Sequence, residues 1–451
     1  MTVVKERVNG FFGITVLPPA AQRLVQKLVL FNVLSSFLFF LSNTFFILFV
    51  EERIGFAGAG VMIALSMFVQ LVTDYPSGAL SDRIGARWVS TLSFVSFSAY
   101  FVLLSIADTL EFFLFLAIIQ GFANGQSSGT VGSWFDSNYK LLAEDKDPGR
   151  KIYGMFQGKQ VVMFRGTLVF SFILGSSLAT VVSREFVFLI QGVTSLVLIF
   201  ASLWLMKDEE GAKKVKSDAK YFAILKEGLR HFVSDKQLFF FYMGSAVTAS
   251  AFMIWGNLLL VPIYFGYTGT DSLTGLLRSF IFVLTLPVGI KVANLSRKVA
   301  NERLPLIRLL EGLIFFPSYF VLTTLVPPTN TFNPLGMTVV VFLMVLIVPA
   351  FADLSNLIAG RVGMEIVPSE IRNSIYSLLP SIIAILGIPV LIIAGFMIEA
   401  VGLPGGILMA LATHLTGSFL IFVSFRVVRN KSVTEEEINA GVLPTNTVPA
   451  P

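Results

Sequence analysis

The chain of 451 residues contains no cysteine, and its only histidines are His231 and His414. Disulfides, thiolate metal sites and cysteine nucleophiles are therefore excluded, and a histidine-based metal site has little support. No Ser-His-Asp set, metal-ligand cluster or phosphate loop is apparent in the sequence. The sequence thus predicts neither an enzyme nor a protein that carries a cofactor or a metal.

Charge is scarce as well, because only 14% of the residues are Asp, Glu, Lys or Arg, against about 25% in soluble domains. Hydrophobic residues make up 55% of the chain, and the mean hydropathy is +0.80. Apolar runs of about 20 residues, long enough to cross a bilayer as a helix, recur along the sequence. These features predict an all-α integral membrane protein whose partners are membrane lipids and a small molecule, without nucleic acid.

Twelve membrane spans are predicted from the apolar runs. The N-terminus lacks the short apolar core and small-residue cleavage site of a secretory signal, so we expect the first span to be retained. The predicted spans are 28–50, 57–79, 88–107, 110–133, 153–180, 185–206, 238–261, 272–293, 304–326, 334–360, 374–397 and 404–427.

The distribution of basic residues supports this count. If the N-terminus is cytoplasmic, 28 of the 33 Lys and Arg residues fall in or beside inner segments, and only Arg53 and Arg184 fall in outer loops. Cytoplasmic loops carry such an excess in membrane proteins. We therefore expect a multi-pass protein of the cytoplasmic membrane with both termini in the cytoplasm.

A polar stretch divides the spans into six and six. The expected domains are a cytoplasmic segment 1–27, a six-helix bundle 28–206, a cytoplasmic linker 207–237, a second bundle 238–428 and a disordered tail 429–451. Within the linker, residues 219–232 have the pattern of an amphipathic helix that lies on the inner leaflet.

The two halves resemble each other. Aligning Pro76 with Pro287 brings "PSGALSDRIGARW" onto "PVGIKVANLSRKV", and "DPGRKIYG" likewise corresponds to "VPSEIRNSIYS". Two related six-span bundles are a transporter architecture, and the substrate site is then expected where they meet near mid-membrane.

The stretch from Pro76 to Trp88 interrupts the apolar pattern with two glycines, an acid and two arginines. Gly78 and Gly85 permit a tight turn between two helices. An acid that is followed by two arginines in such a turn is able to exchange partners when two bundles move.

The motif "GALSDRIGAR" resembles the signature loop between the second and third spans of the major facilitator superfamily, with Ala86 where a basic residue is common. "GSWFDSNY" is similar to the fourth-helix ending of that family, and "VPSEIR" to its loop before span eleven. The resemblance covers residues 28–428 and implies two pseudo-symmetric six-helix bundles that act as a secondary transporter, with the chain as a monomer. It also implies an inner charge network of Asp82, Arg83, Arg87 and Asp136, with Arg372 as a further member.

Charges inside spans are costly, at about 2.5 to 3.5 kcal/mol on insertion scales, and so are candidates for function. Arg165 lies deep in span five and Asp353 deep in span ten, whereas Arg278 lies in the outer third of span eight. Arg165 is expected to bind an anionic group and Asp353 to serve as its counter-ion or as the proton carrier. Asp74, near the inner end of span two, is a second candidate for proton coupling.

Uncharged polar residues in the spans that line the cavity in this family complete the candidate site. They are Asn43, Thr44, Asn124, Gln126, Trp255, Asn257 and Asn356. Gly121, Gly125 and Gly129 form a small-residue stripe that is expected to permit close helix contact. Arg308 and Glu311 are expected to pair with each other, and His414 to serve packing.

Several functions stay open at this level. The favoured function is ion-coupled transport of a small organic anion by alternating access. Efflux of lipophilic or cationic compounds and lipid flipping are alternatives within transport, and a transporter-like receptor or scaffold is the alternative outside it. Span four has Ala117 where proton-coupled drug antiporters carry Arg, span five has no proline, and span one lacks the acid of many sugar symporters. These departures weaken both standard substrate assignments.

Overall fold

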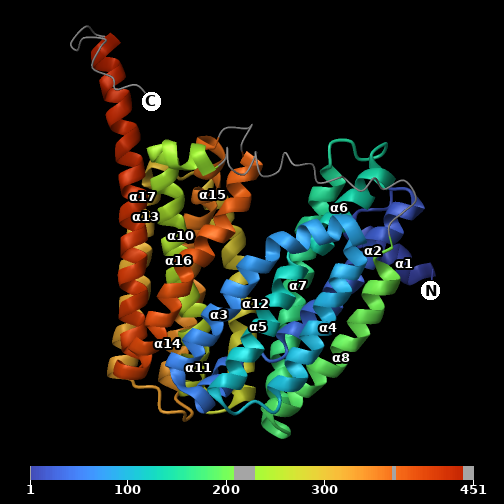
Figure 1. The fold of residues 1–451 in the computed structure, drawn as a ribbon. Helices are drawn as coiled ribbons and strands as arrows, with labels where there is room; N and C mark the ends of the chain where they lie inside the picture. Colours follow the sequence, from blue (N-terminus) through green and yellow to red (C-terminus); the bar gives the residue numbers. More distant parts are fainter. Residues whose placement is uncertain (1, 208–228, 368–371, 440–451) are drawn as a thin grey trace. The chain divides into compact units, whose positions relative to one another are not determined.

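The computed structural model describes residues 2–207, 229–367 and 372–439, and in these residues the chain forms helices and no strand. By its internal contacts the chain separates into two units (Figure 1). Unit 1 comprises residues 1–58, 65–217 and 268–283, and unit 2 comprises residues 59–64, 218–267 and 284–451. The first half of predicted span eight thus groups with the elements that precede the linker.

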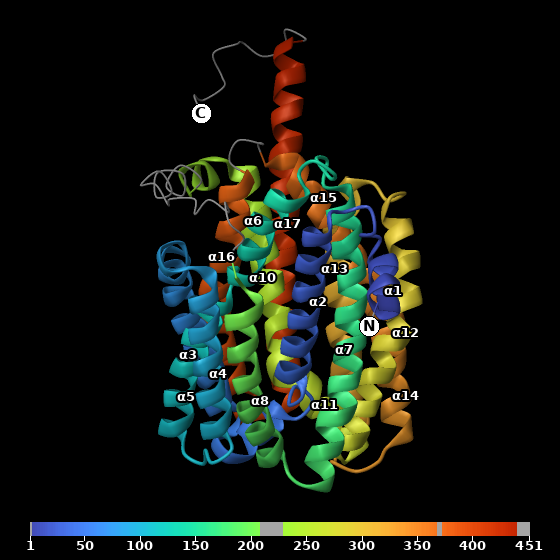
Figure 2. The ribbon, with the colours of Figure 1, turned by 90° about the vertical axis from the view of Figure 1, so that its right-hand side faces the viewer.

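Unit 1 is a bundle in which α4 packs against α5 and α8, and α2 packs against α7 and α8 (Figure 2). Its helices are α1 (Thr2–Phe12), α2 (Pro19–Phe40), α3 (Phe46–Ile84), α4 (Ala86–Leu104), α5 (Leu110–Ser127), α6 (Thr130–Ala143), α7 (Lys151–Val181), α8 (Arg184–Leu205) and the first half of α12 (Asp271–Ser296).

Unit 2 is built around α17, which packs against α10, α13 and α16. Its elements are α10 (Lys236–Ile254), the π-helix η1 (Trp255–Leu259), α11 (Leu260–Thr268), the 3-10 turn η2 (Asn301–Arg303), α13 (Leu304–Leu325), α14 (Pro334–Phe342), the π-helix η3 (Leu343–Asp353), α15 (Leu354–Ile366), α16 (Arg372–Val401) and α17 (Leu403–Asn439). Tyr242, Leu304 and Ile358 belong to its buried core.

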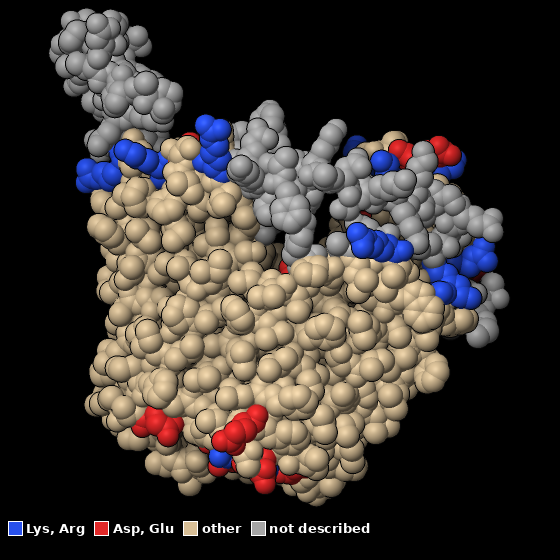
Figure 3. All heavy atoms as spheres, viewed as in Figure 1, with Lys and Arg blue, Asp and Glu red and all other residues tan. Residues whose placement is uncertain are grey.

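Basic side chains gather at one end of each unit, beside α6 in unit 1 and at the end toward which the C-terminus of α17 runs in unit 2 (Figure 3). In each unit the surface below them carries few charged side chains on the face shown. This distribution agrees with the charge asymmetry that the sequence shows.

Eleven helices in the described residues are long and apolar enough to cross a membrane, and each corresponds to a predicted span. The prediction of a continuous fourth span, 110–133, is wrong. The chain breaks at Gly129, whose φ of 68° lies in the left-handed region, and the segment divides into α5 and α6. Gly129 therefore ends a helix and does not extend the small-residue stripe.

The other two glycines of that stripe behave as predicted. A Cβ atom on Gly121 would lie 2.4 Å from the carbonyl oxygen of Ser66, and one on Gly125 would lie 2.1 Å from Oγ1 of Thr73. Only glycine permits α5 to approach α3 this closely.

The first predicted span, 28–50, is not a single helix. Helix α2 begins earlier, at Pro19, and ends at Phe40, and residues 41–45 form a turn before α3 begins. A second irregularity follows at Gly55, where a φ of 70° kinks α3.

The predicted turn between spans two and three is also shorter than expected. Helix α3 continues through Pro76 and Gly78 to Ile84, and α4 begins at Ala86. Gly85 alone makes the junction, with a φ of 94°. The expectation that Gly78 bends the backbone is wrong, because Gly78 lies inside the helix.

The ends of the chain differ from the prediction as well. Helix α1 occupies residues 2–12 of the expected N-terminal segment, and α2 begins within it at Pro19. Helix α17 extends to Asn439, so residues 429–439 are helical where a disordered tail was expected. Most of the predicted linker, including much of its amphipathic segment, lies outside the described residues.

Local capping explains where several helices begin. Thr109, Ser183, Asp235 and Asn333 each accept a backbone N–H in the first turn of α5, α8, α10 and α14, respectively. Asp147 serves α7 in a similar way, because its carboxylate accepts the N–H groups of Ile152, at 3.1 Å, and Tyr153, at 2.9 Å. The hydroxyl of Tyr139 donates a third hydrogen bond, at 2.8 Å.

Asp147 provides a test of this capping. Burial opposes its ionisation, but the N–H groups of Tyr153 and Ile152 and the hydroxyl of Tyr139 outweigh it, so the pKa of Asp147 is lowered. The stabilisation is therefore present above about pH 4 and lost as the pH falls through the folded-state pKa. We expect Asp147→Asn to lower stability by about 1 to 2 kcal/mol at neutral pH and less in acid.

Thermal unfolding of the purified protein, followed by tryptophan fluorescence at several pH values, measures this difference. Asp145→Asn is the matched control, because Asp145 is exposed. Equal losses for the two variants, or a loss for Asp147→Asn that does not change with pH, would contradict the capping role.

Candidate functional site

A cavity of about 390 Å³ lies in unit 1 between α2 and α7. Small-molecule sites typically have volumes of about 300 to 1,000 Å³. Its lining residues are Val29, Asn32, Val33, Ser36, Gln157, Gln160, Val161, Met163, Phe164 and Thr167. None of them is charged.

The polar side chains of this cavity are available for a ligand. In the part of the chain that the structure describes, the side chains of Asn32, Ser36, Gln157 and Gln160 make no hydrogen bond with protein, and each is partly buried. Three amides and a hydroxyl of this kind offer both donors and acceptors. The cavity is therefore suited to a solute with several hydrogen-bonding groups.

The sequence analysis did not select these four residues for the site. The signal was nevertheless present, because Asn32 and Ser36 are spaced i, i+4 and Gln157 and Gln160 are spaced i, i+3, so each pair lies on one helix face. What the spacing did not reveal is that the two faces oppose each other across the cavity.

Arg165, the predicted anion ligand, lies one position after Phe164 on α7 and does not line the cavity. Arg165 is exposed, and it makes no ion pair with the described residues. Its expected partner Asp353 is exposed at the end of η3 in unit 2. The proposed roles of both residues remain predictions.

The turn at residues 41–45 places irregular backbone inside a span. Asn43 and Thr44, both predicted site residues, lie in this turn, and Thr44 is fully buried. Arg278 on α12 donates from Nη1 to the backbone oxygen of Asn43 at 2.8 Å, and its guanidinium lies over the ring of Phe172 at 4.4 Å. Arg278 therefore stabilises the backbone of the turn at residues 41–45.

Neighbouring helices secure the residues before this turn. Gln191 on α8 donates to the oxygen of Leu38 at 2.6 Å, and Ser171 on α7 donates to the oxygen of Phe37 at 3.1 Å. Gly175 is also essential, because a Cβ atom there would lie 1.8 Å from the oxygen of Leu41. The broken span is thus held by α7, α8 and α12.

The remaining predicted site residues of unit 2 lie at its π-helices. Trp255 begins η1 and is buried, with its ring 4.4 Å from that of Tyr319 between centroids. Asn257, also in η1, is exposed and donates to the oxygen of Met253. Asn356 accepts a hydrogen bond from Arg308 at 2.5 Å. Single-turn π segments often occur at functional sites, but the sequence did not predict them.

In unit 1, Asn124 lies near the end of α5, where its backbone oxygen accepts the N–H of Ser128. Gln126 is buried beside it, and its Oε1 atom has no partner among the described residues. Both residues lie at the break before α6. They do not line the cavity between α2 and α7.

The inner charge network is only partly visible. Arg83 and Asp74 are exposed and form no ion pair with the described residues, and Arg87 lies over the ring of Trp88 at 4.9 Å. Asp136 pairs with Arg150, at 2.7 Å, and not with a loop arginine. The side chains of Asp82 and Arg372 lie outside the described part of the chain.

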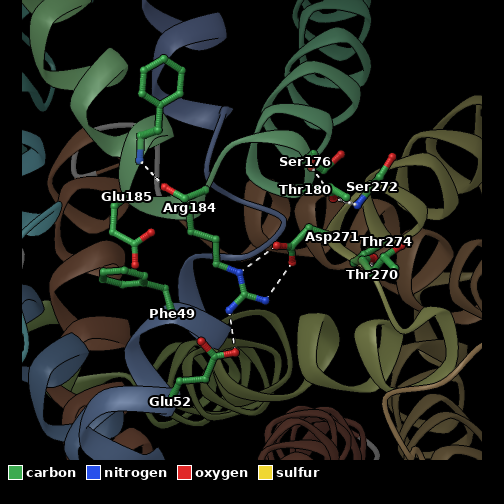
Figure 4. Close-up of polar contacts among 12 residues, drawn as sticks. Phe49, Glu52, Ser176, Thr180, Arg184, Glu185, Thr270, Asp271, Ser272 and Thr274 are labelled. Carbon is green, nitrogen blue, oxygen red and sulfur yellow. Dashed lines mark hydrogen bonds and ion pairs between the residues drawn. The ribbon is translucent and has the colours of Figure 1, made fainter.

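An ion network that the sequence did not predict joins residues near the N-terminal ends of α3, α8 and α12 (Figure 4). Arg184 at the start of α8 binds Asp271 at the start of α12 through two hydrogen bonds, of 2.8 and 3.0 Å, and Glu52 on α3 at 2.7 Å. Arg53 pairs with Glu185 at 2.5 Å. These two arginines are the ones that the predicted topology placed in outer loops.

The comparisons with known proteins agree on the fold. The sequence pattern of the Major Facilitator Superfamily matches residues 28–379. No curated protein sequence matches the chain. Among solved structures, the nucleoside transporter NupG is similar with a TM-score of 0.69 and 15% identity over 89% of this chain and 98% of that chain.

Two further structures show the same likeness. A bacterial homologue of the human lysosomal transporter Spinster, in an inward-facing and unoccupied conformation, has a TM-score of 0.63 and 14% identity over 90% of this chain and 96% of that chain. A D-xylose–proton symporter has a TM-score of 0.63 and 12% identity over 88% of this chain and 97% of that chain. At these identities the likeness shows a shared fold.

The role of Arg278 in stabilising the interrupted first span can be tested by substitution. We expect Arg278→Lys to lower stability by about 1 to 2 kcal/mol, because lysine keeps the charge but loses the planar stacking on Phe172 and the aim toward the oxygen of Asn43. Thermal unfolding of the purified protein measures the loss. Arg165→Lys is the control, and equal stability of Arg278→Lys and the parent protein would contradict the holding role.

Proposed function

Because the chain belongs to the Major Facilitator Superfamily, we propose that it moves a small, uncharged, polar organic solute across the membrane by alternating access. The family match and the similar structures make the chain a membrane transporter and not an enzyme. The observation that supports an uncharged solute is the uncharged cavity between α2 and α7, which has four polar side chains without hydrogen bonds to protein in the described residues.

The chemistry of the cavity supports an uncharged solute. A solute that leaves water loses the hydrogen bonds of its hydroxyl or amide groups, and only matching protein groups offset that loss. Asn32, Ser36, Gln157 and Gln160 supply such groups from two facing helices. Phe164 and the valines of the lining provide an apolar surface for the carbon face of a ring.

The named solutes of two similar structures, a nucleoside and D-xylose, are ring compounds with several hydroxyl groups. A volume of about 390 Å³ accommodates a solute of this size. Both points support the proposal without identifying the solute.

An organic anion is the second candidate, and Arg165 favours it. A guanidinium within a span is costly unless it meets water or a ligand. Arg165 is exposed on the helix that lines the cavity and has no ion-pair partner among the described residues. Binding of anions that is lost in Arg165→Gln would favour this candidate over the uncharged solute.

We also infer that the network around Arg184 closes the outer side of the transporter. Arg184 precedes the predicted linker and Asp271 follows it, so their ion pair joins the two sequence halves. Both side chains are about nine-tenths buried, and charge pairs screened from water are stronger than exposed ones. The inner end of α3, which contains Asp82, and the junction at Gly85 would act as the opposing latch, and the chain would work as a monomer with both termini in the cytoplasm.

The solute class is tested by thermal stabilisation of the purified protein against nucleosides, sugars and organic anions. We expect an uncharged solute to stabilise the parent protein, and Gln160→Ala to require about five- to twelvefold more of it, since one lost hydrogen bond costs about 1 to 1.5 kcal/mol. Gln70→Ala, on α3 and away from the cavity, is the matched control. Stabilisation by anions alone would reject the uncharged solute.

The outer closure is tested with a single introduced thiol, which the absence of cysteine makes straightforward. In Ser36→Cys protein, we expect Arg184→Ala to speed labelling by a membrane-impermeant thiol reagent added from the outer side. Arg53→Ala is the control, because the pair of Arg53 and Glu185 lies wholly before the linker. An unchanged labelling rate in the Arg184→Ala protein would contradict the proposed outer closure.

A further inference from the structure

A fully buried group of polar side chains lies in unit 2, away from the cavity described above. Arg308 and Glu311 on α13 form an ion pair at 2.9 Å, and Ser355 on α15 donates to the same carboxylate oxygen at 2.7 Å. His414 on α17 lies against them, with Nε2 at 2.9 Å from the backbone oxygen of Arg308. The exposed fractions of the four residues are between 0% and 5%.

The sequence predicted this ion pair but not its surroundings. Arg308 and Glu311 were expected to pair near the inner end of their span, and His414 was expected only to pack. The pairing is confirmed. The third partner comes from α17, more than a hundred residues further along the chain, and only the packing of α13 on α17 reveals it.

Three atoms of this group have no hydrogen-bond partner among the described residues. They are Nε of Arg308, Oε1 of Glu311 and Nδ1 of His414. Buried polar atoms without partners are costly and uncommon, and three of them in one cluster call for an explanation. Two of the three, a carboxylate oxygen and an imidazole nitrogen, are able to accept a proton.

The tautomer of His414 follows from its one hydrogen bond. The backbone oxygen of Arg308 is only able to accept, so Nε2 must carry the hydrogen. Nδ1 is then the basic nitrogen with a free lone pair, and it is the atom without a partner. An additional proton on the ring would bind there.

The surroundings of the group favour a proton over other ions. The guanidinium of Arg308 touches the carboxylate of Glu311 and would repel a metal cation, whereas Glu311 would repel an anion. A proton needs no coordination shell and no extra volume. It would convert the imidazole to a cation within electrostatic range of Glu311.

We propose that Glu311 and His414, with Arg308, form a proton-binding site through which the transporter responds to a proton gradient. This proposal rests on the proposed function, because it names the proton as the ion that is coupled to that transport. Protonated His414 competes with Arg308 for the carboxylate, and Arg308 also holds Asn356 on α15 through its other Nη atom. Proton binding therefore changes the contacts between α13 and the helix that follows η3.

Other charged groups near this site are few in the described residues. Beyond Arg308, Glu311 and His414, the elements that pack against α13 carry Asp353 at the end of η3, Glu302 and Arg303 in η2, Arg361 and Glu365 on α15, and Arg426 on α17. The residues of α15 that bond to the ion pair are the neutral Ser355 and Asn356, and the ring of Phe252 on α10 meets the imidazole edge-on at 5.7 Å.

The fit of the imidazole depends on Gly312, since a Cβ atom there would lie 2.4 Å from Cδ2 of His414. A cavity of about 880 Å³ in the same unit is lined by Glu302, Glu365, Leu415 and Ser418 among others. Ser418 donates to the backbone oxygen of His414, so the cavity reaches within one helical turn of the imidazole.

The test uses the full chain in lipid nanodiscs with ¹⁵N-labelled histidine. Because His231 is the other histidine, His231→Asn leaves the signals of His414 alone. We expect an Nε2–H tautomer at high pH that becomes doubly protonated as the pH falls. In Glu311→Gln the midpoint of this change should fall by at least about one pH unit, since a nearby opposite charge favours the charged form.

Glu311→Asp, which keeps the charge, should restore the midpoint most of the way, and Glu302→Gln should leave it unchanged. A single tautomer at every pH, or one midpoint shared by the parent protein and Glu311→Gln, would overturn the proposal. The measurement needs no transported solute. If His414 titrates as expected but no solute stabilises the protein, the site stands and the proposed function fails.

Discussion

Hydrocarbon offers no hydrogen bonds, so a chain that crosses a membrane must satisfy its backbone polar groups within the protein. This constraint governs unit 1 most clearly at residues 41–45, where the first span loses its helical form. Gln191 binds a backbone oxygen just before the break, Arg278 binds one within it, and Gly175 leaves room for the oxygen of Leu41. Three helices are thereby tied to one irregular turn. The cavity lies between α2, which ends at this break, and α7, which contacts it.

The same constraint separates polar side chains into two classes. Most buried hydroxyls in the described spans donate to a carbonyl one turn earlier, as Ser195 and Thr323 do, and they are satisfied without a ligand. Gln157 and Gln160 make no such bond, and neither do Oε1 of Glu311 and Nδ1 of His414. These named groups differ chemically, because Gln157 and Gln160 are neutral, whereas Glu311 and His414 are titratable. The two proposals therefore place solute binding in unit 1 and proton binding in unit 2.

Helix α12 links the two sequence halves through its first turns. Asp271 binds Arg184, the N–H of Ser272 donates to Thr180 at 2.9 Å, and a Cβ atom on Gly275 would collide with the hydroxyl of Ser176. These contacts explain why residues 268–283 group with unit 1 although the linker precedes them. In the proposed outer closure, these are the contacts that would break when the outer side opens.

Composition, apolar run length and basic-residue placement were enough to predict an all-α membrane protein, and the loop that contains Gly85 was enough to indicate its family, because these properties depend on solvent and local backbone preference. The pairing of Arg308 with Glu311 was also predictable, since i, i+3 spacing is a property of the helix itself. The breaks at residues 41–45 and at Gly129, the π-helices, the partner of Arg184 and the approach of His414 were not. Each depends on which helix faces which, and that is decided by packing between residues far apart in the chain.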